Sequence, residues 1–277
     1  MKTKLTIASV MTVGALLLSL ATPTSANASL GHYANLAYQD NFSSGTDAGW
    51  TRLSAFALSS GQTWNASTFA YQLTAPPNGF NPGNGQYGFV GSAVSSLPLF
   101  GNGYVQSDVV IWQGGGPLPS GFGAFGLGAR LNNLNLPLAL NGYAIVYEPY
   151  GNSGGPTLRL NRIGPPSIFN NLGSVNVNLT PGSPYTFTLE TTGSSIVGSI
   201  WNFGQVGTSL VGQVSAIDST YASGYVGLAG VCQAPMPTVD TTWDNYIVMV
   251  PEPGTGVLLG LGLVGFLARR RFGWKRS

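Results

Sequence analysis

Glu148 and Glu190 are the only glutamates between residues 29 and 250, and they are the first place to look for chemistry. Hydrolysis of a glycosidic bond usually requires two carboxyl groups that flank the bond. Glu148 is followed by the turn-forming residues 149–151 and Glu190 by residues 191–193, so neither belongs to a run that places a second carboxylate on the same face of a strand. The sequence therefore predicts no catalytic site. An aspartate–glutamate pair brought together by folding is the alternative.

His32 and Cys232 are the only residues of their types. A Ser-His-Asp triad or a histidine-rich zinc site would depend on His32 alone, and this residue lies close to the expected mature N-terminus, where chains are commonly disordered. A single cysteine excludes an intrachain disulfide. We expect Cys232 to be buried as a small apolar residue, and a free thiol for intermolecular pairing is the alternative.

Two short runs near the ends of the body combine carboxylates with amides. Asp40 and Asn41 precede a phenylalanine, and Asp244 and Asn245 precede a tyrosine. Calcium prefers such oxygen ligands, so Asp40 and Asp244 are candidate ligands of a structural Ca²⁺ ion, with the two asparagines as helpers. The alternative is that these side chains cap turns or bond neighbouring backbone amides.

Carbohydrate binding would combine exposed aromatic rings with amide side chains that bond sugar hydroxyl groups. Trp64 lies among polar residues and is the best candidate for an exposed ring, followed by Trp112, which lies just before a glycine run. Asn132 and Asn133 supply a polar loop. Trp243 is expected in the core.

Charged residues are scarce in residues 29–250. Four arginines and eight acidic residues give this body a net charge of −4, and it contains no lysine. Nucleic acid is therefore not an expected partner, because phosphate binding requires clustered basic residues. So little charge would also leave self-association unopposed.

The periodicity of the body is two, which is typical of half-buried strands. Glycine, proline, asparagine and serine clusters separate the segments, as expected for turns. No segment shows an amphipathic helical stripe. The predicted strands span residues 36–42, 68–73, 104–112, 122–131, 143–147, 157–162, 175–179, 185–190, 195–201, 225–229 and 243–250.

The last of these strands has a predicted orientation. Trp243, Ile247 and Met249 are expected on one face, with Tyr246 and Val248 on the other, because alternate residues of a strand point to opposite sides.

The N-terminal residues have the pattern of a signal peptide. Lys2 and Lys4 precede an apolar stretch over residues 5–21, and Ala26 and Ala28 form a small-residue cleavage site. We expect residues 1–28 to form a signal helix that the Sec export machinery recognises, so that the mature chain begins near residue 29.

The C-terminal residues 250–277 have a second targeting pattern. Residues 250–253 precede an apolar segment, 254–268, and a basic stop, 269–276. A helix over the apolar segment would be roughly 22 Å long, shorter than a full bilayer span, and its basic end would stay cytoplasmic. An ordinary membrane anchor or a core helix is the alternative.

This order of motif, apolar segment and basic stop resembles the PEP-CTERM sorting tail of Gram-negative bacteria. The resemblance implies processing by an exosortase near the Pro-Glu-Pro motif, and an association with exopolysaccharide and biofilm matrix. The residues that match the family's motif and basic cluster are Pro251, Glu252, Pro253, Arg269, Arg270 and Arg271.

The body, residues 29–249, resembles concanavalin A-like domains of the LamG and glucanase type. The resemblance rests on the order of strands, including a hairpin over 142–147 and 157–162, a pair over 185–190 and 195–201, and a closing strand at 243–248. It implies an all-β, antiparallel jelly-roll sandwich whose first and last strands lie side by side. The chain lacks the glutamate–aspartate–glutamate strand motif of the glucanase branch.

Together these patterns predict an exported, exosortase-processed protein of the cell surface or extracellular matrix, which binds or organises extracellular polysaccharide without catalysis. One alternative is a divergent extracellular glycan hydrolase or lyase. Another is a purely structural, self-associating matrix protein.

Overall fold

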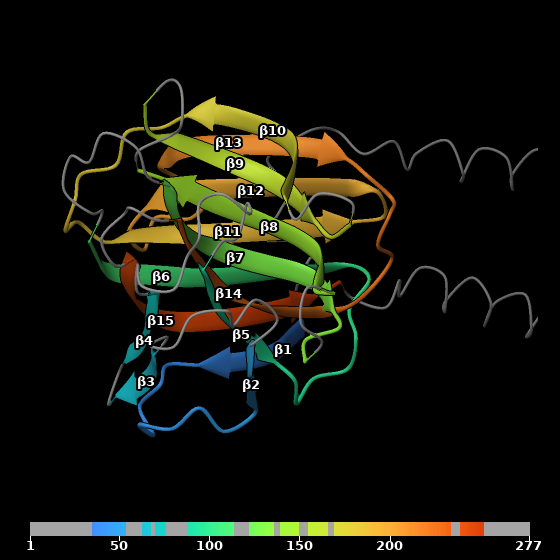
Figure 1. Cartoon of the computed structure of the whole chain (residues 1–277), viewed down its shortest axis with the longest axis horizontal. Helices are drawn as coiled ribbons and strands as arrows, with labels where there is room; N and C mark the ends of the chain where they lie inside the picture. The colour runs from blue at the N-terminus through green and yellow to red at the C-terminus, as the bar shows by residue number, and fades with distance from the viewer. Residues whose placement is uncertain are drawn as a thin grey trace, which may run out of the picture.

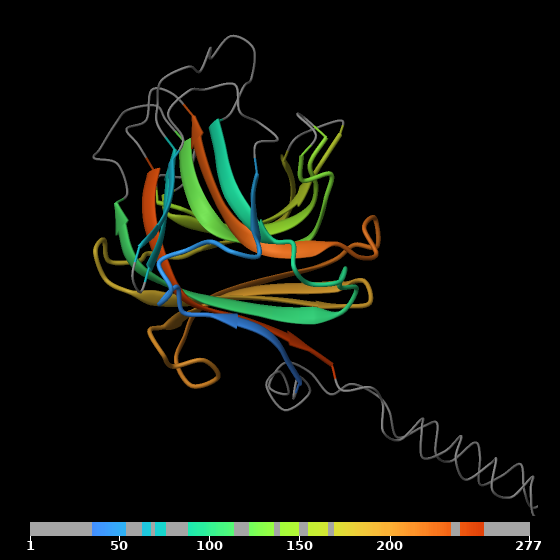
Figure 2. The ribbon, with the colours of Figure 1, turned by 90° about the horizontal axis from the view of Figure 1, so that it is seen from below.

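The computed structural model describes residues 35–53, 63–67, 70–75, 88–113, 122–135, 139–149, 155–165, 169–233 and 239–251. Within these ranges the chain forms β-strands that pair into two antiparallel sheets, which pack face to face (Figures 1 and 2). The predicted all-β antiparallel sandwich is confirmed. The predicted signal helix and the apolar segment 254–268 lie outside the described residues.

The larger sheet has the strand order β13-β12-β11-β6-β15-β4-β3. The strand β15 is long, so its first half pairs with β4 and its second half pairs with β1. Its strands are β1 (Asn35–Asp40), β3 (Thr63–Ser67), β4 (Ala70–Ala75), β6 (Gly103–Gln113), β11 (Tyr185–Thr192), β12 (Ser195–Asn202), β13 (Leu210–Ile217) and β15 (Val239–Val250).

The smaller sheet has the strand order β10-β9-β8-β7-β14-β5-β2. Its strands are β2 (Trp50–Leu53), β5 (Gly88–Val94), β7 (Phe122–Asn132), β8 (Asn141–Glu148), β9 (Thr157–Ile163), β10 (Phe169–Asn176) and β14 (Tyr225–Gln233).

The predicted pairings are confirmed. The first and last strands are neighbours, with Asp40 opposite Tyr246, and β8–β9 and β11–β12 form the two predicted hairpins. The strands β2, β3, β5 and β13 were not predicted, because they are short or rich in glycine, alanine and serine, which weakens the alternation of apolar and polar residues. The predicted strand over 175–179 was misplaced, since β10 ends at Asn176 and residues 177–179 follow it.

The core between the sheets is aromatic. The ring of Phe125 on β7 packs against Trp112, Tyr147, Phe187 and Trp243, with ring centroids 5.4 to 6.1 Å apart. All five side chains are buried, and they come from both sheets. This cluster confirms the predicted core position of Trp243.

The predicted faces of the last strand were wrong beyond Trp243. Tyr246 and Val248 are buried with Trp243, whereas Ile247 is only partly buried. The register of β15 against β6 shifts between Asp244 and Ile247. Asn245, at this β-bulge, has a φ of 50°. A bulge adds one residue to the strand and therefore reverses the alternation that follows it.

The smaller sheet bends so that its outer face lies on the inside of the curve (Figure 2). Glycines permit close approach of its strands. A Cβ atom added at Gly126 would lie 1.8 Å from the carbonyl oxygen of Ile145, and one at Gly227 would lie 2.2 Å from that of Ser92. Only glycine fits such positions, so these residues allow the curvature.

In the described part of the chain, we find no helix with the length and apolar character needed to cross a membrane.

Candidate functional site

Polar side chains occupy the outer face of the smaller sheet where β8, β9 and β10 lie together. On β9, Leu158 and Leu160 point into the core between the sheets, so the residues that alternate with them point outward. Antiparallel partners share a face, and the register extends the outward set onto both neighbouring strands. The apolar members of this outward set are Ala144, Val146, Ile163 and Phe169, which pack in one cluster. We call its polar members the outer strip: Glu148, Thr157, Arg159, Asn161, Asn171, Ser174 and Asn176.

The outer strip runs from an exposed side to a buried one. Asn171, Ser174 and Asn176 on the edge strand β10 are exposed. Asn161 on β9 and Glu148 on β8 are buried. A polar surface therefore leads from solvent to a carboxylate.

The buried part of the strip contains an ion pair. Oε2 of Glu148 lies 2.9 Å from Nε of Arg159. The Glu148 side chain is 2% exposed and that of Arg159 is 25% exposed, so Arg159 is the more accessible member of the pair. The two atoms are buried, yet neither makes a hydrogen bond within the structure.

Burial governs the protonation of this pair. Removal from solvent raises the pKa of Glu148 to about 7, although the positive charge of Arg159 acts in the opposite direction. A buried polar atom without a hydrogen bond is costly, by about 1 to 3 kcal/mol, and usually signals a missing partner. A hydroxyl group could donate to the carboxylate and accept from the guanidinium at the same time.

The outer strip was not predicted as a unit. Glu148 was considered as a strand-end residue and as one member of a possible carboxylate pair, but not together with Arg159. The alternation of Thr157, Arg159 and Asn161 was available in the sequence, but the pairing of β8, β9 and β10 that adds the other residues was not.

The two glutamates do not meet. Glu190 lies on β11 in the larger sheet, opposite Tyr104, and alternates with the buried core residue Leu189. Its side chain therefore points to the outer face of that sheet, while Glu148 lies on the outer face of the other sheet. The hydrophobic core separates them.

The predicted aromatic platforms serve other roles. Trp112 is 2% exposed and its Nε1 donates to the carbonyl oxygen of Ser183 at 3.0 Å, so its ring cannot stack on a sugar and that prediction was wrong. Trp64 is half-buried, and its Nε1 donates to the carbonyl oxygen of Gly91 at 2.7 Å. This bond links β3 to β5 of the other sheet, and the Arg52 guanidinium lies over the ring.

The asparagine side chains of the predicted polar loop donate hydrogen bonds to backbone carbonyl groups. Nδ2 of Asn132 donates to the carbonyl oxygens of Arg130 and Ser223. Asn133, with a φ of 58°, donates to the carbonyl oxygen of Ala139 at 3.1 Å. These amides fasten the turn after β7 and do not belong to the outer strip.

Asp40 fits the turn-capping alternative better than a calcium site. Its Oδ1 accepts a hydrogen bond from the backbone amide of Phe42 at 2.7 Å. Its Oδ2 accepts from Trp50 Nε1 at 2.9 Å and from the Tyr38 hydroxyl at 3.0 Å. Both oxygens are already bonded to donors of the protein.

Asp244 has a similar local role. Its Oδ1 accepts from the backbone amide of Asn245 at 2.7 Å, within the bulge of β15. Burial raises the pKa of Asp244, the hydrogen bond from the Asn245 amide lowers it, and the charge of Asp40 raises it further. Among the described residues, no group of three or more histidine, cysteine, aspartate or glutamate side chains is arranged to hold a metal ion. Calcium also accepts amide and backbone oxygens, so the calcium site at Asp40 and Asp244 stays a prediction.

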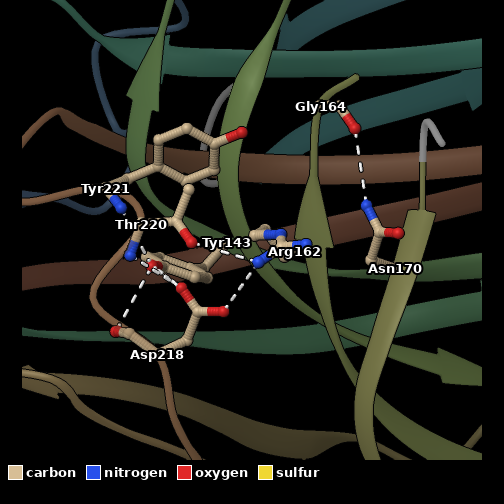
Figure 3. A network of polar contacts seen from close by, with 7 residues as sticks. All are labelled: Tyr143, Arg162, Gly164, Asn170, Asp218, Thr220 and Tyr221. Carbon is tan, nitrogen blue, oxygen red and sulfur yellow. Dashed lines mark hydrogen bonds and ion pairs between the residues drawn. The ribbon is translucent and has the colours of Figure 1, made fainter. Parts of the chain in front are cut away.

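A second arginine of β9 forms a fully bonded cluster, which Figure 3 shows. Asp218 accepts hydrogen bonds from the Tyr143 hydroxyl at 2.6 Å, the Thr220 amide at 2.8 Å and Nη1 of Arg162 at 3.0 Å. The Tyr143 hydroxyl also accepts from the amide of Tyr221. Burial raises the pKa of Asp218, but these bonds and the charge of Arg162 outweigh it, so the pKa is lowered. We call this cluster the Asp218 clamp.

Comparison with known proteins identifies the C-terminal motif. Residues 250–271 match the PEP-CTERM protein-sorting motif, as the sequence pattern indicated. The motif indicates an exosortase substrate that is exported and held by a C-terminal anchor before cleavage. No curated protein matches the chain.

The body is similar in fold to jelly-roll domains of the concanavalin A-like type, which are carbohydrate-binding modules and glycan hydrolases. A mutant form of the carbohydrate recognition domain of Emp46p has a TM-score of 0.51 and 12% identity, over 77% of this chain and 96% of that chain. LamAcat from Zobellia galactanivorans has a TM-score of 0.50 and 13% identity, over 79% and 99%. The carbohydrate binding module CBM66 from Bacillus subtilis has a TM-score of 0.48 and 16% identity, over 73% and 95%.

Proposed function

We propose that this exosortase substrate binds neutral, hydroxyl-rich polysaccharide of the extracellular matrix through the outer strip. The observation that carries the proposal is the pair formed by Glu148 and Arg159, in which two buried polar atoms lie 2.9 Å apart and make no hydrogen bond. A sugar hydroxyl supplies the missing donor and acceptor. The exposed amides and hydroxyl of β10 extend the contact to neighbouring sugar units.

The chemistry of the strip favours a neutral polymer. Glu148 and Arg159 compensate each other's charge, and the other members of the strip are asparagine, serine and threonine. The carbohydrate recognition domain of Emp46p shares the fold, and this likeness supports the proposal at the level of fold alone. Export to the cell surface or matrix, as the sorting motif suggests, would bring the strip to extracellular polysaccharide.

The proposal is tested by affinity electrophoresis of the purified protein in gels that contain a neutral glucan, a galactan or a uronic-acid polymer. Arg159→Ala removes the accessible half of the pair, so we expect at least a tenfold loss of retention in the gel that retards the wild type. Arg52→Ala is the matched control, because it removes the same charge from an exposed ion pair with Asp47 on another part of the surface. Equal retention of wild type and Arg159→Ala would contradict the proposal.

A glycan hydrolase is the second candidate, and one observation favours it. A carboxyl group with a pKa of about 7, like that of Glu148, suits a general acid at neutral pH. The reaction requires a second carboxylate within roughly 5 to 10 Å. Glu190 lies on the other sheet, and the pKa of Glu148 carries no contribution from another acid. Release of reducing ends from a retained polymer would favour this candidate over binding alone.

A further inference from the structure

The strand β13 is an open edge of the larger sheet. It pairs with β12 on one side, and no strand in the described part of the chain pairs with its other side. Figure 1 shows β13 at the top of the molecule, beside the edge strand β10 of the other sheet. Open edges present unpaired backbone groups to other chains, and natural proteins commonly protect them with charged residues or proline.

This edge has neither form of protection. β13 contains no charged residue and no proline. Glu190 is the only charged residue between Arg162 and Asp218, a stretch that includes β10, β11, β12 and β13. A second copy of the chain would therefore meet no repulsion between like charges at this edge.

Apolar side chains concentrate around the same edge. The exposed large hydrophobic residues of the described part are Leu36, Leu99, Ile111, Phe203, Leu210 and Ile217. Leu210 and Ile217, which are 51% and 76% exposed, are the two ends of β13, and Phe203, 46% exposed, lies in the connection that leads into it. Both ends of β13 are therefore exposed.

The outward face of β13 is self-complementary. Val214 is buried toward the core, so Gln213 and Ser215 point outward, and Ile217 continues this alternation. A register shift between Ile200 and Trp201 of β12 places Leu210, opposite Trp201, on the same outward face. This face thus has apolar ends and a polar middle, a pattern that matches itself when the strand is reversed.

We propose that two copies of this chain associate through β13, with antiparallel pairing about a two-fold axis. The pairing joins the two larger sheets into one continuous sheet. Leu210 of each copy then lies near Ile217 of its partner, and the polar middles face each other. Such an isologous contact uses the same strand twice and closes after two copies. Backbone hydrogen bonds between edges supply the affinity, as in other cases of strand addition.

The contact leaves the outer strip free, because that strip lies on the smaller sheet. A dimer would present two strips to one polymer chain and so bind more tightly than either strip alone. The dimer itself does not depend on the proposed glycan binding.

Cysteine cross-linking in the detergent-solubilised full chain tests the contact. In the pairing that brings Leu210 near Ile217, position 213 of one copy lies opposite position 215 of the other, so mild oxidation should link the double variant Gln213→Cys/Ser215→Cys into a dimer. The matched control is Asn65→Cys, an exposed position on β3, the opposite edge of the same sheet. Unaltered protein, which contains Cys232, sets the background. Cross-linking no greater than that of Asn65→Cys would overturn the proposal.

Sedimentation equilibrium supplies the second measurement. Gln213→Lys places two like charges on neighbouring positions near the centre of the contact, so we expect the dissociation constant of the dimer to rise at least tenfold. The C-terminal tail is present in both proteins, so the difference reports on β13. A monomeric wild type, or an unchanged dissociation constant, would overturn the proposal. Arg159→Ala should remain dimeric, which separates failure of this contact from failure of glycan binding.

Discussion

Two arginines of β9, three residues apart, lie beside carboxylates in contrasting environments. Arg162 belongs to the Asp218 clamp, in which the carboxylate accepts bonds from Tyr143, Thr220 and the arginine itself. Arg159 approaches Glu148 to 2.9 Å, but the facing atoms make no hydrogen bond. The pKa of Asp218 is lowered, and that of Glu148 is raised to about 7.

The contrast shows that an ion pair alone does not stabilise a buried carboxylate. Both acids have an arginine, and burial raises both pKa values. Burial acts more strongly on Glu148, whose side chain is 2% exposed against 10% for Asp218, and Asp218 also has donors that outweigh its smaller burial effect. The clamp therefore acts as a structural link between the β8–β9 hairpin and the segment after β13. The pair in the outer strip retains bonding capacity that a ligand can use.

The largest expected effect is on the free energy of unfolding and comes from Glu148, whose pair with Arg159 lacks hydrogen bonds. The folded-state pKa of Glu148, about 7, exceeds its ordinary value of 4.5, so the folded chain holds this proton more tightly than the unfolded chain does. The resulting stability is fully present below pH 4.5 and is lost as the pH rises through 7. Glu148→Gln cannot ionise and should be more stable than wild type above pH 7, by up to about 3 kcal/mol at 1.4 kcal/mol per pKa unit.

Urea unfolding between pH 4 and 9 measures this difference. The free energies of unfolding of wild type and Glu148→Gln should agree near pH 4 and separate as the pH rises. Parallel profiles would show that Glu148 does not ionise with a raised pKa.

Removal of the carboxylate from the Asp218 clamp should lower the stability of the protein, whereas removal of the charge at Glu148 raises it. Asp218→Ala leaves the Tyr143 hydroxyl and the Arg162 guanidinium without their shared acceptor. The loss of unfolding free energy at pH 7 should be about 2 kcal/mol, the usual cost of unsatisfied partly buried groups. Since the pKa of Asp218 is lowered, this contribution is present above its ordinary pKa and disappears as the pH falls below it. An effect as small as that of Arg52→Ala, at an exposed pair, would argue against a structural link.

The smallest effect concerns metal removal. Asp40 resembles Asp218, since donors of the protein already occupy both of its oxygens. Dialysis against a chelator should therefore leave the melting temperature of the protein unchanged. A clear fall in melting temperature, reversed by calcium, would revive the calcium site predicted at Asp40 and Asp244.

Local pattern was enough to predict much of the fold. Period-two alternation located strands such as β8 and β11. The resemblance to jelly-roll domains, with the matching runs at Asp40 and Asp244, placed the first and last strands side by side. The faces of β15 could not be predicted, because a bulge at Asn245 depends on pairing with β6 rather than on alternation.

The site was harder to predict for the same reason. The outer strip comes from three strands whose register the sequence does not state, so Glu148 was considered without Arg159. Trp112 precedes a glycine run, which suggested exposure, but side chains distant in sequence, Phe125 and Tyr147, cover its ring.

The most direct test compares Glu148→Gln with Asp218→Asn, two variants with the same chemical change, for retention by the polysaccharide that retards the wild type and for melting temperature at pH 8. We predict that Glu148→Gln melts higher and loses retention, whereas Asp218→Asn melts lower and keeps retention at temperatures where it is folded. Full retention by Glu148→Gln, or equal loss in both variants, would contradict a polysaccharide site at the outer strip.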